Sequence, residues 1–170
     1  MEQKHSWRPS GRAAAGIAAS AVLAVFGAGA LTAQAAEWTA SGRDGTAGVM
    51  SGEGEVRLTG SCNSRLGPGF YATLGGYQGD ALQRIDDQSE QVTFEVAFRD
   101  GSRQSFQAPM HFFAPDAAHV LSEPLPVAFF DAFARGDSLA IRNQAGVNVA
   151  QWGLAGSAVA VRTMREICGF

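Results

Sequence analysis

The sequence predicts a mainly β fold: an antiparallel β-sandwich or a curled sheet, with two packed α-helices and a single disulfide. Short stretches of alternating apolar and polar residues recur along the chain, and glycine-rich or proline-rich turns separate them. A helical period occurs in only two segments, one before and one after a final hairpin. The chain holds two cysteines, Cys62 at the end of a predicted strand and Cys168 at the end of the last helix.

Residues 1–35 have the pattern of a signal peptide. Basic residues precede an apolar run over residues 13–31, and the alanines at 33 and 35 fit the small-x-small cleavage rule. A membrane anchor is the alternative, because the run is near spanning length, but its alanine and glycine content makes it a weak span. We therefore expect cleavage before Ala36, a single secreted β-rich domain over residues 36–170, and a location in the bacterial periplasm or outside the cell.

The expected mature domain is acidic. Residues 36–170 contain ten arginines, no lysine and fifteen acidic residues, which gives a formal net charge of −5. This balance disfavours nucleic acid and anionic membrane surfaces as partners. A basic protein or a cell-envelope component is the partner that we expect, and no motif in the sequence indicates a cofactor.

Three strands are predicted in the first part of the domain. The first covers residues 36–41 and includes Trp38, and residues 42–54 form a loop or a glycine-loosened hairpin. Residues 55–62 alternate with a period of two. One face of this strand holds Val56, Leu58, Gly60 and Cys62. A turn at residues 63–69 leads to the third strand at residues 70–74.

The middle of the domain contains a polar connection between strands. Residues 77–90 are acidic, which predicts a surface loop with few apolar anchors and room for a short strand at residues 81–85. Residues 91–99 alternate without interruption, and the Asp-Gly pair at 100–101 favours a hairpin into a strand at residues 102–108. Residues 117–121 are predicted as a strand edge.

Two helices flank the final hairpin. The first is expected to open at residues 122–124, to start between Pro124 and Pro126, and to end near Arg135. A hairpin over residues 138–152 follows. The second helix begins at Ala158, with Ser157 as its expected N-cap.

The pairing of Cys62 with Cys168 follows from the cysteine count and the expected export. Two cysteines in an exported chain indicate one disulfide rather than a redox or metal pair. Both residues lie on the apolar faces of their predicted elements. The bond would join the strand at 55–62 to the C-terminal helix.

No group of residues in the sequence reaches the pattern of a catalytic or metal site. His111 and His119 with Asp116 make a weak zinc pattern, and we expect partly exposed loop histidines. Either cysteine with a histidine would suit a nucleophilic pair, but disulfide formation is the simpler interpretation. Ser157 lacks the second glycine of a nucleophile elbow. The acidic loop lacks EF-hand spacing.

Binding is therefore the function that the sequence favours. The predicted binding residues are the four acids of the polar connection, Asp80, Asp86, Asp87 and Glu90. We expect them to steer a basic partner and to be dispensable for stability. The leading hypothesis is an exported, non-enzymatic domain that binds a protein or a cell-envelope component.

Two alternatives to simple binding remain at this point. One is an inhibitor of an envelope hydrolase such as a lysozyme, with residues 63–69 or 77–90 as the inserted loop. The other is a small hydrolase that uses His111, His119 or Ser157.

Three features of the sequence are shared with a known group of proteins. They are an early Trp38, a strand of sequence Val-Arg-Leu-Thr-Gly-Ser-Cys at 56–62, and Trp-Gly-Leu-Ala-Gly-Ser at 152–157 before a helix that ends in Cys168. In these features the chain resembles small exported proteobacterial proteins of the invasion-associated locus B type and related domains of unknown function. The resemblance implies a secreted, disulfide-linked β domain, and it supplies no catalytic residues.

Overall fold

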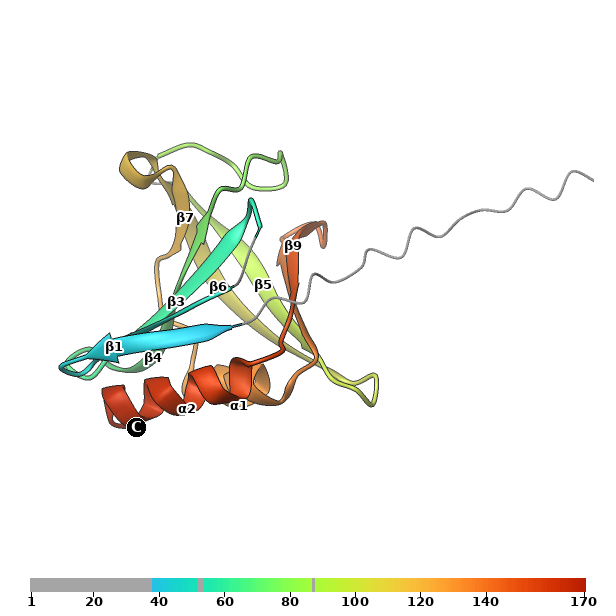
Figure 1. Cartoon of the computed structure of the whole chain (residues 1–170). Helices are drawn as coiled ribbons and strands as arrows, with labels where there is room; N and C mark the ends of the chain where they lie inside the picture. Colours follow the sequence, from blue (N-terminus) through green and yellow to red (C-terminus); the bar gives the residue numbers. More distant parts are fainter. Residues whose placement is uncertain (1–37, 52–53, 87) are drawn as a thin grey trace, which may run out of the picture. The chain divides into compact units, whose positions relative to one another are not determined.

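The computed structural model describes residues 38–51, 54–86 and 88–170. Nine strands form one sheet, in the order β1-β2-β3-β4-β7-β6-β5-β8-β9, and every neighbouring pair is antiparallel (Figure 1). The first five strands are β1 (Thr39–Arg43), β2 (Thr46–Met50), β3 (Arg57–Asn63), β4 (Gly67–Gly75) and β5 (Ser89–Ala97). The others are β6 (Arg103–Phe113), β7 (Ala118–Leu121), β8 (Ser138–Asn143) and β9 (Asn148–Gly153). Of the two predicted arrangements, a β-sandwich or a curled sheet, the structure has the curled sheet. The expected signal peptide, residues 1–35, lies outside the described residues.

The alternation in β5 determines which face of the sheet is internal. Val92, Phe94 and Val96 are almost completely buried. Phe94 pairs with Phe106 of β6 on one side and with Ile141 of β8 on the other. Because paired residues of antiparallel strands point to the same face, these strands share one apolar surface, as the period of two predicts.

Trp38, which precedes β1, connects the two ends of the strand order. Its backbone N–H donates to the Ala155 carbonyl at 3.2 Å, and its indole Nε1 donates to the Gly153 carbonyl at 2.7 Å. Trp38 is 3% exposed, and its ring packs edge-on against Phe133 with the centroids 4.7 Å apart. The sheet is therefore curled enough for its first strand to begin beside the end of its last.

Two helices cover one end of the curled sheet (Figure 1). They are α1 (Val127–Arg135) and α2 (Ser157–Cys168), and the short 3-10 helix η1 (Ala114–Asp116) lies between β6 and β7. The ring of Phe70 contacts three aromatic rings of α1, those of Phe129, Phe130 and Phe133, at centroid distances from 4.9 to 5.8 Å. All four rings are fully buried. This cluster is the centre of the hydrophobic core.

The phenyl ring of Phe70 needs the space left by a glycine. A Cβ added at Gly60 of β3 would lie 1.9 Å from the Phe70 ring. Gly60 pairs with Ala72 of β4, so the ring extends across the neighbouring strand. A side chain at Gly60 would displace the ring around which α1 packs.

The predicted disulfide between Cys62 and Cys168 is confirmed. The two residues are 106 positions apart in the sequence, and their Cα atoms are 6.2 Å apart. Both cysteines are buried, at 1% and 4% exposure. The bond fixes the last turn of α2 to the inner face of β3.

Both helix starts differ from the predictions. Residues 122–124 do not open α1: the chain bends at Ser122 and Glu123, Leu125 exchanges two backbone hydrogen bonds with Phe70, and the helix begins after Pro126. Ser157 is the first residue of α2 and not its N-cap, which is Gly156 at a φ of 87°. A Cβ at Gly156 would lie 3.1 Å from the Trp38 carbonyl oxygen, so both the backbone angle and the space favour glycine there.

Several strand boundaries also differ. Residues 67–69 belong to β4 rather than to a turn, and residues 81–85 form no strand. β7 lies between β4 and β6 instead of forming an edge. For the glycine-rich segment after Trp38, the sequence left a loop or a hairpin open, and the structure has a hairpin, since β1 pairs with β2. Three residues, not two, separate Phe98 from Ser102 in the β5–β6 hairpin, where the Phe98 N–H donates to the Ser102 carbonyl.

Candidate binding surface

The polar connection after β4 forms a lid, residues 77–86, over the end of the curled sheet away from the helices (Figure 1). Tyr77 is 7% exposed and Leu82 is 3% exposed, and both belong to the core. The Tyr77 hydroxyl accepts a hydrogen bond from the Ala81 N–H at 3.0 Å. The few apolar anchors of this connection, Tyr77 and Leu82, therefore reach the core, and the rest of the segment lies at the surface.

Three strands hold the backbone of the lid. Asn143 of β8 donates from Nδ2 to the Ala81 carbonyl at 2.9 Å. The Gln83 N–H donates to Glu90 Oε1 of β5 at 2.6 Å, and the Gln83 carbonyl lies 3.1 Å from His119 Nε2 of β7. The lid is therefore fixed at both its apolar side chains and its peptide groups.

The predicted binding acids divide into two kinds. Glu90 anchors the lid, and Asp86 accepts a hydrogen bond from the Ala114 N–H of η1 at 2.9 Å. Asp80 is exposed and makes no hydrogen bond among the described residues. The same holds for Asp116 in η1, a residue that was not among the predicted binding acids. Asp87 lies outside the described residues. Asp86 and Glu90 therefore have structural partners, and the expectation that the four acids are dispensable for stability stays a prediction.

Negative charge is concentrated at this end. We define the acidic end as the lid, Glu90, Phe113 and η1. It carries four carboxylates, those of Asp80, Asp86, Glu90 and Asp116, against the single guanidinium of Arg84. The remaining described residues carry eight carboxylate side chains and nine arginines. The net negative charge of the described side chains therefore lies on one small surface.

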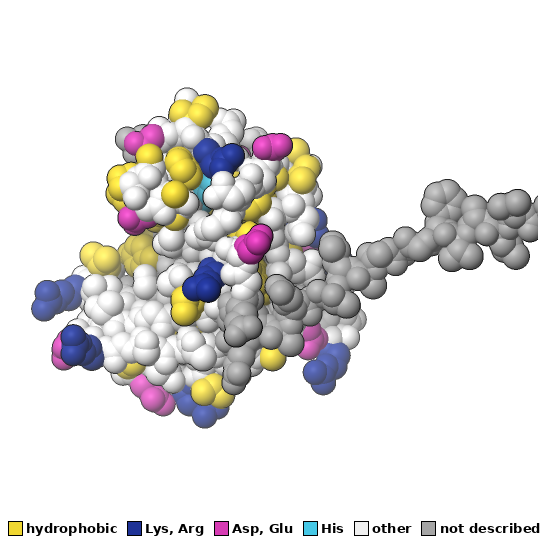
Figure 2. Space-filling model, turned by 45° about the horizontal axis from the view of Figure 1, so that its top comes forward, with side chains coloured by type: hydrophobic (Ala, Val, Ile, Leu, Met, Phe, Trp, Pro, Cys, Tyr) yellow, Lys and Arg dark blue, Asp and Glu magenta, His cyan; other side chains and the backbone are white. Residues whose placement is uncertain are grey.

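Two large apolar side chains are exposed within the acidic end. Ile85 is 52% exposed and Phe113 is 38% exposed. The parallel bridge between Asp86 and Phe112 brings the segments that carry them together. Figure 2, in which the lid end is turned forward, shows hydrophobic side chains gathered there between acidic and basic ones. An apolar centre with a charged rim is typical of a protein-binding surface.

The two histidines lie in strands and not in loops, contrary to the expectation. His111 of β6 is 3.0 Å from the Ser122 hydroxyl through Nδ1. His119 of β7 is 1% exposed, and burial lowers the pKa of its imidazole below the ordinary value of 6.5. Within residues 38–51, 54–86 and 88–170, no three histidine, cysteine or acidic residues gather as metal ligands would.

The other residues considered for catalysis have structural partners. Ser157 is 1% exposed, and its hydroxyl donates to the Phe133 carbonyl at 2.8 Å. Phe133 is in the last turn of α1, where carbonyl groups lack helical partners. Cys62 and Cys168 are joined to each other. Neither Ser157 nor the cysteines are therefore placed as accessible nucleophiles.

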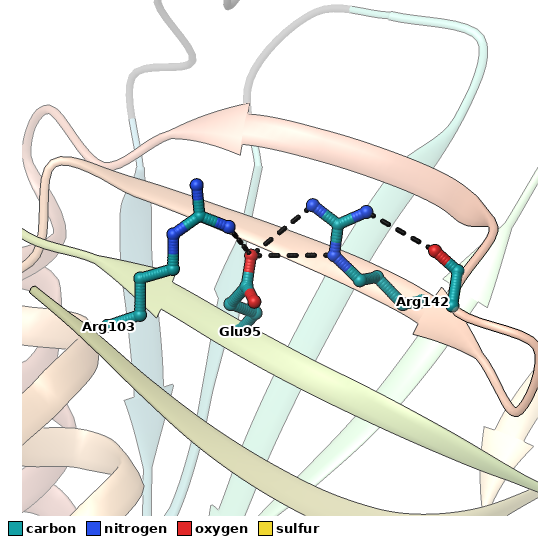
Figure 3. Close-up of polar contacts among 4 residues, drawn as sticks. Glu95, Arg103 and Arg142 are labelled. Carbon is teal, nitrogen blue, oxygen red and sulfur yellow. Dashed lines mark hydrogen bonds and ion pairs between the residues drawn. The ribbon is translucent and has the colours of Figure 1, made fainter. Parts of the chain in front are cut away.

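A second polar cluster lies on the outer face of the sheet, and the sequence reasoning missed it (Figure 3). Glu95 Oε1 of β5 accepts from Arg103 Nη1 of β6 at 2.7 Å and from Arg142 Nη2 of β8 at 3.3 Å. The three residues occupy diagonal positions on neighbouring strands, so only the strand register brings them together. Arg103 and Arg142 are partly exposed, and such pairs contribute about 0–1 kcal/mol each.

Two surface grooves lie away from the acidic end. One, of about 430 Å³, is lined by Glu55, Val56 and four residues of β9. The other, of about 470 Å³, lies beside the β5–β6 hairpin and the end of α1. Neither includes a residue of the lid.

No family model, curated protein or solved structure matches this chain. The resemblance to the invasion-associated locus B type therefore stays a prediction. Among the described residues, no helix has the length and apolar character needed to cross a membrane.

Proposed function

We propose that this chain is an exported binding domain, without catalytic residues, that recognises a basic protein through its acidic end. The observation that supports the proposal best is the exposure of Ile85 and Phe113 within the acidic end, where four carboxylates lie with a single arginine. The carboxylates would orient a basic partner during approach, and the two apolar side chains would be buried on contact. Export rests on the signal-peptide pattern of residues 1–35.

The fixed lid supports the same proposal. Hydrogen bonds from β5, β7 and β8 hold its peptide groups before any partner arrives. A surface that is already ordered loses less conformational entropy on binding than a mobile loop does. The lid is therefore built to present its exposed side chains in one arrangement.

Inhibition of an envelope hydrolase such as a lysozyme is the second candidate. The fixed lid favours it, since preorganised loops are what tight enzyme inhibitors insert or lay across a cleft. Of the two loops considered, the β3–β4 turn now spans only residues 64–66 and exposes Leu66, whereas the lid is ten residues long. The lid is therefore the segment that would contact the enzyme.

The test of binding uses two carboxylates that play no part in the lid. Asp80→Asn with Asp116→Asn removes two charges from the acidic end and breaks no hydrogen bond among the described residues. A basic lysozyme serves as the probe, and its association rate is measured from about 0.02 to about 0.3 M salt. We expect the double variant to associate about two- to tenfold more slowly at low salt and to lose most of the salt dependence.

The matched control removes two charges elsewhere. Asp44 in the β1–β2 turn and Glu166 of α2 are exposed and lie outside the acidic end. The variant with Asp44→Asn and Glu166→Gln has the same net charge as the test variant. If both variants slow association equally, net charge alone acts and the proposed surface is wrong. Lysozyme activity in the same mixtures separates inhibition from binding without inhibition.

A further inference from the structure

His119 contacts the lid through one ring nitrogen, while its other ring nitrogen is buried without a partner among the described residues. A carbonyl oxygen only accepts hydrogen bonds, so His119 Nε2, 3.1 Å from the Gln83 carbonyl, must carry the proton. In the neutral imidazole the other nitrogen, Nδ1, is then unprotonated. Nδ1 is buried and has no hydrogen-bond partner among the described residues. When the ring is neutral, the closed lid therefore requires the tautomer with its proton on Nε2.

Aromatic and charged groups surround the imidazole. The ring of Tyr77 from the lid lies edge-on to it with the centroids 5.8 Å apart, and the ring of Phe112 from β6 lies at 5.2 Å. Two charged groups act on it: Glu90 of β5 favours the imidazolium, and Arg84 of the lid disfavours it. A proton added at Nδ1 would thus be a buried donor in a mostly apolar setting.

We propose that protonation of His119 opens the lid, so that the acidic end is assembled at neutral pH and released in acid. A buried N–H without an acceptor is costly, and a buried positive charge adds to that cost. Opening the lid exposes the ring to water and removes both costs. The consequence for partner binding rests on the proposed function, whereas the opening itself does not.

The direction of the pH dependence follows from linkage. Burial lowers the pKa of His119 in the closed lid, while the solvated ring of the open lid has the ordinary value of 6.5. Above that value both forms are neutral, and the closed lid keeps its full stability. As the pH falls from there toward the lowered value, the open form binds protons first, and the closed lid loses stability.

Amide hydrogen exchange in the lid tests the proposal without any ligand. The N–H groups of Ala81 and Gln83 are both hydrogen-bonded in the closed lid. Their protection is expressed relative to intrinsic exchange, which removes the direct effect of pH. We expect it to fall about tenfold or more between about pH 7.5 and about pH 5, which stays above the ordinary titration of glutamate.

Two variants separate His119 from other titrating groups. His119→Gln keeps a donor for the Gln83 carbonyl but does not titrate, so its lid protection should be flat over this range. His111→Gln removes the other strand histidine, which contacts Ser122 and not the lid, and should retain the wild-type fall. Equal falls in His119→Gln and the wild type, or a flat wild-type profile, would overturn the proposal.

Direct titration of the wild type gives a second measurement, which does not depend on the folding of a variant. Imidazole ¹⁵N shifts should show the Nε2–H tautomer of His119 at neutral pH and a pKa below 6.5. The Nδ1–H tautomer, or a pKa at or above 6.5, would contradict the proposal. A partner that fails to bind at any pH, beside a lid that opens in acid, would reject only the proposed function.

Discussion

The two ends of the curled sheet are closed in different ways. At the helix end the closure is apolar and covalent: Trp38, Phe70 and Phe133 pack together, and the disulfide fixes α2 to β3. At the lid end it depends on hydrogen bonds to peptide groups, with Tyr77 and Leu82 as the buried side chains. An ion pair between Arg165 of α2 and Asp131 of α1, at 2.8 Å, lies at the surface of the helix end, whereas the polar contacts of the lid end include a buried histidine.

The difference indicates where stability and function lie. Buried aromatic side chains contribute about 1.5–3 kcal/mol each, whereas a single hydrogen bond contributes about 0.5–1.5 kcal/mol net. Regions held mainly by polar contacts open at lower free energy than the core, and binding surfaces are often drawn from them. We therefore expect changes at the helix end to lower the global stability and changes at the lid end to act locally.

The largest expected effect follows loss of the disulfide. Cys168→Ser and Cys62→Ser delete the same link, which closes a loop across 106 positions. The chain-entropy relation gives about 4.7 kcal/mol for a loop of about a hundred residues, as an upper guide. Both variants should lose this much or less in the free energy of unfolding, with α2 detaching first. Urea unfolding of each variant measures the loss.

The double variant is the control for this prediction. If the two cysteines act only through their bond, the double variant should be no less stable than either single one. Intact-mass measurement under denaturing, non-reducing conditions counts thiols in exported protein and shows whether the chain starts at Ala36. Two free thiols, a disulfide-linked dimer or a full-length chain would contradict the expected exported, bonded form.

The sequence predicted the apolar and covalent contacts better than the polar ones for a physical reason. The period of two around Val92, Phe94 and Val96 and the apolar placement of Cys62 and Cys168 are local patterns that survive in the fold. The same local reasoning failed for polar side chains, as for the imidazole of His119, because such a group has many possible partners along the chain, whereas two cysteines have only each other.

Ser157 and the lid show this failure in detail. Ser157 fits an N-cap by position, but its hydroxyl bonds to a carbonyl 24 residues away. The contact of His119 with Gln83 spans 36 residues, and that of Asn143 with Ala81 spans 62. Without the strand order, polar residues in a loop are expected to be exposed to solvent. The sequence did not determine the strand order, so it could not show that β7 and β8 lie close enough to bind the lid.

The next effect in size concerns Ser157 at the helix end. Ser157→Ala leaves the Phe133 carbonyl buried without its donor, which costs about 1–3 kcal/mol. The loss should appear in global urea unfolding, since α1 and α2 meet there. Ser89→Ala, which removes an exposed hydroxyl contact with Ser122, is the matched control and should change stability by less than about 0.5 kcal/mol. Equal losses in both variants would remove the distinction between buried and exposed hydroxyls.

The smallest global effect is expected at the lid, from Glu90→Ala. The variant removes the acceptor of the Gln83 N–H, and hydrogen bonds to charged groups contribute about 1.5–3 kcal/mol when fully formed. Because this bond is exposed to solvent, we expect about 1 kcal/mol, or about fivefold less protection of lid amides, with global unfolding changed by less than about 0.5 kcal/mol. Glu90→Gln keeps an oxygen acceptor at the same place and should show a smaller loss of protection. A fall in global stability as large as that of Ser157→Ala would mean that the lid and the helix end unfold as one unit, and the contrast between the two closures would then be wrong.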